Sequence, residues 1–272
     1  MNLLKLTEIL KPSFLIVILL YCHLLKAQDS TIVKNEPGIR QVQALTVDGK
    51  ENDWPAVLPY FDKDAGISYS ITHNDSMAYI CLKPKDDIAQ VKIIKAGLTI
   101  YIDQSGKKKK ACSILFPIPT ENESSSGSQL NDLKTMEFMA FMNVKEYRLS
   151  GFIKGNGTFN KDQGNDAGVE VKIGFSEKGE LIYEAAIPFA AFYPKQKISE
   201  EDNGKSIAIG FFIDSFTKPI APDNNASYSK SSVDRSSQSN SSGNPQPGLE
   251  QMRQLYVKTK TWRLINLDSV TR

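Results

Sequence analysis

Residues 169–175 have the sequence VEVKIGF, in which apolar side chains alternate with charged or small ones. Successive side chains of an extended strand point to opposite faces, so this order predicts a strand with one buried and one wet face. The same alternation returns in residues 67–71, 98–102 and 207–213. Further strand candidates are residues 41–47, 77–82, 111–116, 146–153, 180–187 and 254–265.

Many short strands separated by turn residues are typical of an all-β fold. We therefore expect a two-sheet antiparallel β-sandwich of the immunoglobulin-like or jelly-roll-like type. Two short helices are expected beside it, one capped by Asp87 and ended by Gly97, and one over residues 131–142. Residues 120–130 and 222–248 are polar and hold few apolar side chains, so we expect them to be mobile insertions.

Residues 1–27 have the features of a secretory signal peptide. Lys5 and Lys11 supply a positive start, residues 14–22 form an unbroken apolar run, and Ala27 offers a small residue for cleavage. Cleavage after this segment predicts a secreted or periplasmic protein.

Two alternatives to cleavage remain open. A membrane anchor needs about 20 apolar residues, and this run ends before His23, so an uncleaved anchor is the less favoured interpretation. A lipid on Cys22 is disfavoured because Tyr21 stands where such sites have a small residue. After cleavage we expect no membrane span, a lead-in over residues 28–44 and one domain over residues 45–268.

The charge balance excludes one class of partner. The chain carries 33 basic and 31 acidic residues, and the signal segment removes three lysines and one glutamate, which leaves 30 of each. A neutral chain has no electrostatic footprint for nucleic acid, so no nucleic-acid partner is expected. Residues 107–110 are four consecutive lysines after a Ser-Gly turn, and we interpret them as a solvated hairpin tip.

Two cysteines remain after cleavage, Cys81 and Cys112, and each lies in an apolar run. An exported protein can join such a pair, and the spacing permits it. Buried free thiols also fit, because cysteine packs as a small apolar residue. No C-x-x-C spacing indicates a metal site.

Two segments carry a resemblance to a known family: residues 47–54, with Val47-Asp48-Gly49 and Trp54, and residues 181–189. Together with residues 79–82, 97–103 and 207–211, they resemble the family 9 carbohydrate-binding modules (CBM9) and their CBM9-like relatives in secreted bacterial proteins. The resemblance spans roughly residues 45–267. It implies a β-sandwich without catalytic activity that binds a polysaccharide or another glycan.

The residues of this motif have structural roles that can be argued separately. Asp48 and Gly49 favour a tight turn, because glycine tolerates positive φ and aspartate bonds its own following backbone. Trp54 is expected to pack its large ring against the sandwich. Glu184 points to the opposite face from its strand neighbours, and Pro188 ends that strand.

Catalysis has little support in the sequence. His73 is the one histidine outside the signal segment, and its polar turn predicts a surface position, a poor scaffold for a Ser-His-Asp triad. A haem site built on His73 and Met77 has equally little context. A carboxylate pair for glycoside hydrolysis would draw on Asp103, Glu137, Glu170, Glu184 and Asp214. Because the resembled family is not catalytic, we expect no enzyme activity.

Sugar sites combine aromatic faces with polar side chains. The resemblance implies two tryptophans around the sugar, but this chain holds only two, and one of them, Trp54, matches a structural position. We therefore expect Trp262 with Arg263 beside it, and Tyr101 and Tyr69 in place of the second tryptophan. Core packing of Trp262 is the open alternative, and a structural or protein-interaction sandwich without a sugar site is the rival function.

The resemblance also implies structural calcium. Two acidic loops are candidates, one around Asp162, Asn165 and Asp166 and the other around Asp62 and Asp64. Both lack the ligand spacing of an EF-hand, so we favour their interpretation as ordinary turn residues. No other metal or cofactor is expected, and the sequence does not predict the oligomeric state.

Overall fold

The computed structural model describes residues 39–40, 44–119, 133–216 and 253–268, all of which belong to one compact unit, residues 36–272. The predicted signal segment and both predicted mobile insertions lie outside the described residues. No helix in the described ranges is long and apolar enough to cross a membrane.

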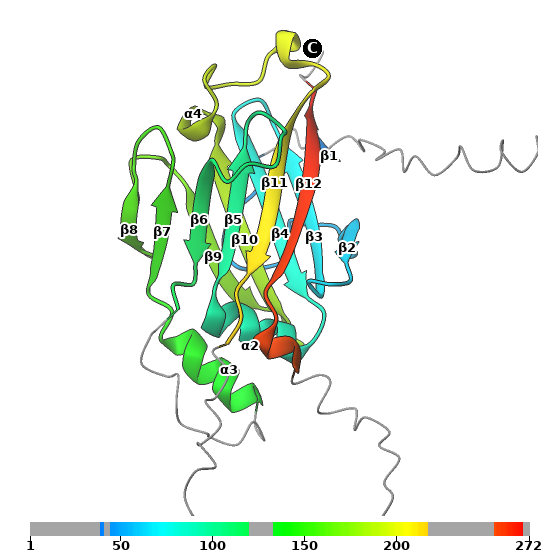
Figure 1. Cartoon of the computed structure of the whole chain (residues 1–272), viewed down its shortest axis with the longest axis vertical. Helices are drawn as coiled ribbons and strands as arrows, with labels where there is room; N and C mark the ends of the chain where they lie inside the picture. The colour runs from blue at the N-terminus through cyan, green and yellow to red at the C-terminus, as the bar shows by residue number, and fades with distance from the viewer. Residues whose placement is uncertain (1–38, 41–43, 120–132, 217–252, 269–272) are drawn as a thin grey trace, which may run out of the picture. The chain divides into compact units, whose positions relative to one another are not determined.

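Two six-stranded sheets make up the fold (Figure 1). The sheet in front in Figure 1, here the front sheet, has the strand order β12-β11-β5-β6-β7-β8. Its strands are β5 (Leu98–Asp103), β6 (Cys112–Phe116), β7 (Glu146–Ser150), β8 (Gly157–Asn160), β11 (Lys205–Ile213) and β12 (Thr259–Leu267). The back sheet has the order β1-β3-β4-β10-β9, with β2 paired to β3. Its strands are β1 (Ile39–Arg40), β2 (Tyr60–Asp62), β3 (Ile67–His73), β4 (Met77–Pro84), β9 (Glu170–Phe175) and β10 (Leu181–Pro188).

Every pairing is antiparallel except the short β1–β3 contact, so the predicted antiparallel β-sandwich is confirmed. Two strand predictions need correction. Residues 44–47 are not a strand, and residues 254–256 form a 3₁₀ turn before β12 begins at Thr259. The short strands β2 and β8 were not predicted.

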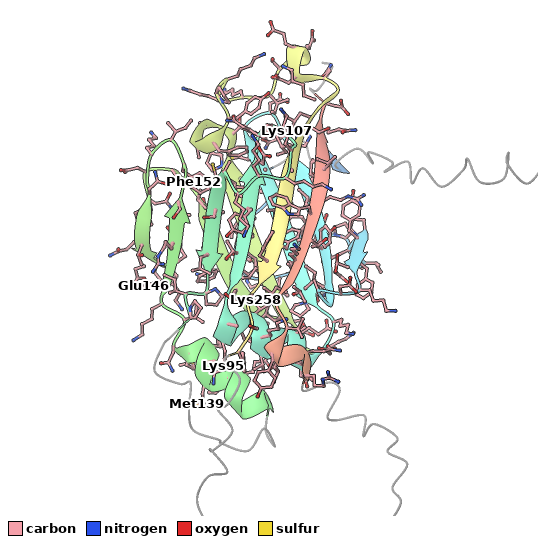
Figure 2. The ribbon with its side chains drawn as sticks, viewed as in Figure 1. Lys95, Lys107, Met139, Glu146, Phe152 and Lys258 are labelled. Carbon is pink, nitrogen blue, oxygen red and sulfur yellow. The ribbon has the colours of Figure 1, made fainter. Side chains whose placement is uncertain are left out.

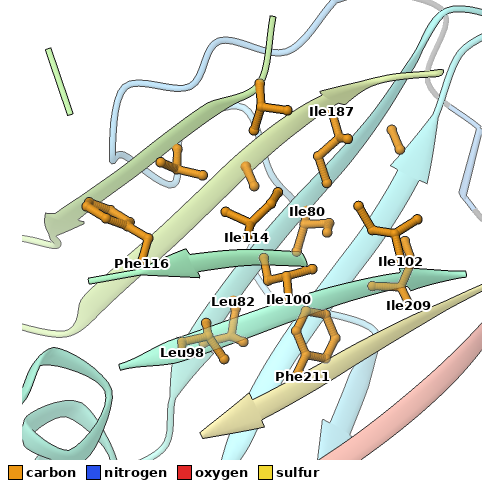
Figure 3. Packing of buried hydrophobic residues seen from close by; sticks show 14 of the residues in the cluster. Ile80, Leu82, Leu98, Ile100, Ile102, Ile114, Phe116, Ile187, Ile209 and Phe211 are labelled. Atoms are coloured by element: carbon orange, nitrogen blue, oxygen red, sulfur yellow. The ribbon is translucent and has the colours of Figure 1, made fainter. Parts of the chain in front are cut away.

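The core lies between the sheets. Figure 3 shows Ile80 and Leu82 of β4 packed with Ile100, Ile114 and Phe211 of the front sheet, and all five are at most 1 % exposed. These residues occupy alternate positions in their strands, as the period of two requires. Burial of each such side chain contributes about 1.5–3 kcal/mol, so the alternation is also the main source of stability.

Both predicted helices are present: α2 (Asp87–Ala96) and α3 (Leu133–Met142), with a one-turn helix α4 (Phe189–Phe192) after β10. The cap of α2 is Asp86, one residue before the predicted Asp87, and its carboxylate accepts the Ala89 N–H at 2.9 Å. Gly97 ends the helix with a φ of 87°, as predicted. In Figure 1, α2 lies at one end of the sandwich.

A small second cluster covers the outer face of the back sheet. Trp54 and Leu58, from the segment before β2, pack on Tyr79, Cys81 and Ile182 of β4 and β10. The indole of Trp54 is 9 % exposed, which fits the structural role that its motif predicts. Because these residues pack against the sheet from outside, the part of its outward face over β4 and β10 is occupied by the chain itself.

The carboxylate of Glu184 ties this outer segment to β10. One oxygen accepts the backbone N–H groups of Asp48 at 3.0 Å and Gly49 at 2.6 Å, and the other accepts the Trp54 indole N–H at 2.6 Å. Burial raises the pKa of the Glu184 carboxyl, while the three N–H donors favour its ionised form. The resembled motif therefore describes one buried hydrogen-bond network rather than a ligand site.

Candidate functional site

An aromatic surface lies on the outer face of the front sheet. Tyr101 on β5 and Trp262 on β12 both pair with Gly210 on β11, so the three residues form one row across the sheet. Phe212 stands two residues along β11 from Gly210 and points to the same side. We call Tyr101, Phe212 and Trp262 the aromatic platform.

Gly210 lets the indole of Trp262 lie flat on the sheet. A Cβ atom at Gly210 would lie 2.8 Å from two ring atoms of Trp262 and 3.0 Å from a third. Three nearly equal distances mean that the ring presents a face, not an edge, to the strand beneath it. The opposite face of the indole is directed away from the sheet, and Trp262 is half-buried.

Tyr101 extends this floor, and Phe212 stands against it. The ring centroids of Tyr101 and Trp262 are 6.3 Å apart with an interplanar angle of 29°. Their strands are two spacings apart, about 10 Å, so both rings lean over Gly210. The Phe212 ring is nearly perpendicular to Tyr101 (79°, 4.8 Å) and to Trp262 (82°, 5.6 Å). The platform therefore has a flat floor and one upright wall.

Lys110 lies in the corner between floor and wall. Its ammonium is 5.0 Å from the Tyr101 ring centroid and 4.6 Å from that of Phe212, which is cation–π geometry. The residue belongs to the connection between β5 and β6, in which Figure 2 labels Lys107. The lysine run is thus a hairpin connection as predicted, but its last member contacts the platform.

Two of the predicted sugar-site residues do not lie on the platform. Tyr69 is 5 % exposed, and its ring packs in the core against Tyr60 and Phe211, with centroid distances of 5.4 and 4.9 Å. Arg263 follows Trp262 along the strand and so points to the opposite face, where its guanidinium lies 3.9 Å from the Tyr60 ring centroid. Of the four predicted residues, the structure brings together Tyr101 and Trp262.

The carboxylates considered for hydrolysis lie on different elements. Asp103 closes the turn after β5, where it accepts the backbone N–H groups of Ser105 and Lys109 at 2.9 and 2.8 Å. Burial opposes ionisation of Asp103, but these hydrogen bonds hold its pKa below the usual value. Asp214 pairs with Lys258 at 2.9 Å.

The other three candidates are Glu184, already bonded to the outer segment, Glu170 at the exposed start of β9, and Glu137, buried on α3. Asp103, Glu184 and Asp214 are thus already engaged by backbone N–H groups, an indole N–H or a lysine. These local roles give no specific support to carboxylate-pair chemistry.

His73 is buried, which corrects the predicted surface position. It is 2 % exposed at the end of β3, with Nδ1 3.2 Å from the Asn74 carbonyl and Nε2 3.1 Å from the Asn266 carbonyl of β12. The turn is polar, but the end of β12 covers it. Both ring nitrogens face backbone carbonyls, so the ring links the two sheets and is not placed as a base or a haem ligand.

Cys81 and Cys112 are free and buried, so the interpretation as unpaired thiols is confirmed. Cys81 lies in the outer cluster and Cys112 in the main core. Burial raises the pKa of both thiols, that of Cys112 to about 11, so neither is a reactive nucleophile near neutral pH.

The acidic loops considered for calcium contain turn hydrogen bonds. Asp62 accepts the Ala65 N–H at 2.7 Å, and Asn165 both accepts from and donates to the Val169 backbone. Among the residues described, no group of three or more His, Cys, Asp or Glu side chains is arranged to hold a metal ion.

The carboxylate of Asp202, before β11, is buried and accepts four hydrogen bonds. These come from Lys205 at 2.9 Å, from the Tyr193 hydroxyl at 2.9 Å and from the Ser199 backbone and hydroxyl. Burial opposes ionisation, but these donors hold the pKa of Asp202 well below its usual value. The arrangement fastens a turn and leaves no carboxylate oxygen directed to a ligand.

Because the pKa of Asp202 is lowered in the folded state, its contribution to stability depends on pH. An aspartate whose pKa is lower in the folded state stabilises the fold above its unfolded pKa of about 3.9, and the stabilisation is lost as the pH falls below that value. We expect Asp202→Asn to lower the free energy of unfolding by about 1–3 kcal/mol at pH 7. In urea unfolding, the difference in free energy of unfolding between the wild type and Asp202→Asn should become smaller from pH 5 to pH 3. An equal difference at pH 7 and pH 3 would refute this role.

Comparison with known proteins gives a partial likeness to a solved structure. No model of a known protein family matches the chain, and no curated protein matches its sequence. Among solved structures, a family 9 carbohydrate-binding module from Caldicellulosiruptor kristjanssonii, in complex with glucose, is similar with a TM-score of 0.30 and 13 % identity. The match covers 65 % of this chain and 78 % of that module. At this level the likeness carries no argument, and the fold rests on the strands described above.

Sequence reasoning missed Phe212, Gly210 and Lys110. The alternation of β11 does place Phe212 outward, on a strand whose other outward residues are Ser206, Ala208 and Gly210. One large outward ring on a strand whose other outward side chains are small is a usable signal. The pairing of Gly210 with both aromatic strands depends on long-range register and has no local signal.

Proposed function

We propose that this chain is an exported, non-catalytic carbohydrate-binding β-sandwich that holds a glycan on the aromatic platform. The observation that carries the proposal is the pair of rings, Tyr101 and Trp262, that lean over Gly210 to form a floor. The C–H face of a pyranose packs on aromatic faces, and neighbouring polar groups bond its hydroxyls. Export rests on the signal-like residues 1–27, and the CBM9-like motifs are consistent with the function.

Hydroxyl groups lie beside this floor. The row that holds Tyr101, Gly210 and Trp262 continues through Ser113 on β6 to Ser150 on β7, and each pair shares one face of the sheet. Ser113 is half-buried and Ser150 is exposed. The floor and its polar continuation thus supply both kinds of contact that a sugar needs.

A titration of the mature protein with a panel of neutral and acidic oligosaccharides tests the proposal. For the oligosaccharide that binds best, we expect Trp262→Ala to weaken binding roughly tenfold to a hundredfold, because it removes half of the floor. Gly210→Ala should also weaken binding, because the added Cβ atom displaces the indole of Trp262 without removing it. The control is Phe61→Ala, which removes a ring 58 % exposed on β2 of the back sheet.

Failure of every sugar to bind, or equal losses in Trp262→Ala and Phe61→Ala, would contradict the proposal. Thermal unfolding of each variant checks that the domain remains folded. Trp262 is half-buried on the outer face, so we expect its loss to change stability by less than about 2 kcal/mol.

A second candidate, a protein-interaction domain, is favoured by α3. Phe138, Met139 and Met142 are 60 %, 56 % and 61 % exposed, and Figure 2 labels Met139 on this helix, which packs beside α2. Neighbouring exposed apolar side chains are typical of contact surfaces. Loss of a protein partner in Met139→Ser with glycan binding unchanged would assign α3 to a separate role.

A further inference from the structure

Three basic side chains lie on the outer face of the front sheet near the platform. Lys260 pairs with Phe212 across β11 and β12, so it stands on the outer face beside the wall of the platform and is exposed. The same row runs from Phe212 through Thr99 and Leu115 to Arg148 on β7, also exposed. Together with Lys110 in the corner, three cations line the platform and the row beside it.

No acid within the described residues neutralises Lys110 or Lys260. Neither lysine has an ion pair with a described carboxylate, in contrast to Lys258, which pairs with Asp214. The nearest outward acid on β5, Asp103, is two residues from Tyr101, and its carboxylate already accepts N–H groups of its own turn. Cation–π contact is a weak restraint at an exposed site, about 0.5–1 kcal/mol, so the Lys110 ammonium is free to pair with a ligand anion.

This local charge contrasts with the chain as a whole, whose basic and acidic residues balance after the signal segment. The rings of Tyr101 and Trp262 can accept a pyranose face. The ammonium of Lys110 beside them, and that of Lys260 beyond Phe212, are complementary to a negative group at the edge of such a sugar ring. We propose that the platform selects a polyuronate, a polysaccharide with carboxylates on its pyranose rings. This proposal rests on the carbohydrate-binding function proposed above.

In this arrangement one uronate ring stacks on Trp262 and Tyr101 while its carboxylate pairs with Lys110. A carboxylate of a neighbouring sugar along the chain pairs with Lys260. Binding changes no covalent bond. Its electrostatic part is screened by salt, with a Debye length of about 10 Å at 0.1 M, whereas the stacking part is not.

The test compares a polyuronate with the same polymer after reduction of its carboxylates to primary alcohols. We expect the wild type to bind the polyuronate roughly tenfold more tightly, and 0.5 M salt to remove most of this difference. Lys110→Gln should weaken polyuronate binding roughly threefold, and Lys110→Gln with Lys260→Gln roughly tenfold, with no change for the reduced polymer. Lys178→Gln, in the exposed turn before β10, is the charge-matched control.

Each outcome decides one of the two proposals. Equal binding of both polymers through Trp262, or equal losses on both polymers in the lysine variants, would leave carbohydrate binding intact and overturn the uronate selection. Preference for a sulfated glycan over the polyuronate, lost in the same variants, would also overturn it. Binding of no glycan at all would overturn the carbohydrate function itself.

Discussion

Glu184→Ala is expected to lower the free energy of unfolding by about 3–5 kcal/mol. The change leaves three N–H donors without their acceptor: the Asp48 and Gly49 amides and the Trp54 indole. Each buried donor left without a partner lowers the free energy of unfolding by about 1–3 kcal/mol. The total stability of the domain is expected to be only about 5–15 kcal/mol. Thermal unfolding should show a midpoint roughly 10 °C lower.

Two further variants separate this network from a general effect of charge. Glu170→Ala removes an exposed carboxylate from the neighbouring strand and should change stability by less than about 0.5 kcal/mol. Glu184→Gln places an amide NH₂ against one of the donors, and its effect should be smaller when Trp54→Phe has removed the indole N–H. Additive effects of Glu184→Gln and Trp54→Phe would show that the two side chains are not coupled.

Gly174→Ala is expected to destabilise the domain by at least about 3 kcal/mol. A Cβ atom at Gly174 would lie 2.1 Å from the carbonyl oxygen of Gly49, and Gly49 has a φ of 80°. The obstructing atoms are backbone, so relief requires the outer segment with Trp54 to move away from the back sheet. Urea unfolding, followed by tryptophan fluorescence, measures both the loss and the exposure of Trp54.

The matched control is Gly164→Ala. A Cβ atom at Gly164 would meet nothing within 4 Å, and its φ is not positive, so the variant should unfold as the wild type does. A Gly174→Ala protein as stable as Gly164→Ala would show that the outer segment is not held as closely as the structure indicates.

Local sequence patterns predicted most of the fold because the period of two is a local property. The alternation in residues 169–175 and 207–213 gave the strands and their buried faces, and Gly97 gave the end of α2. The cap was placed one residue late because Asp86 and Asp87 are equally good caps by residue type. Residues 44–47 look like a strand but pair with no strand in the described part of the chain.

The incorrect predictions for Tyr69, Arg263 and His73 have two different causes. Tyr69 and Arg263 could have been excluded from the sequence, since Tyr69 alternates with core residues Ile67 and Ile71 and Arg263 follows Trp262 directly. His73 could not, because β12 covers it from far along the chain. The Glu184 network likewise joins residues about 130 positions apart, and no local pattern reports such a contact.

If the platform binds a glycan, the outer face of Trp262 contacts the sugar while Trp54, in its buried network, does not. The chain has two tryptophans, so its ¹H–¹⁵N spectrum holds two indole N–H signals, one of them from the Trp54–Glu184 hydrogen bond. On titration with the best-bound oligosaccharide, the Trp262 signal should shift in proportion to saturation and the Trp54 signal should stay in place. Saturation with no shift of the Trp262 signal would contradict the account.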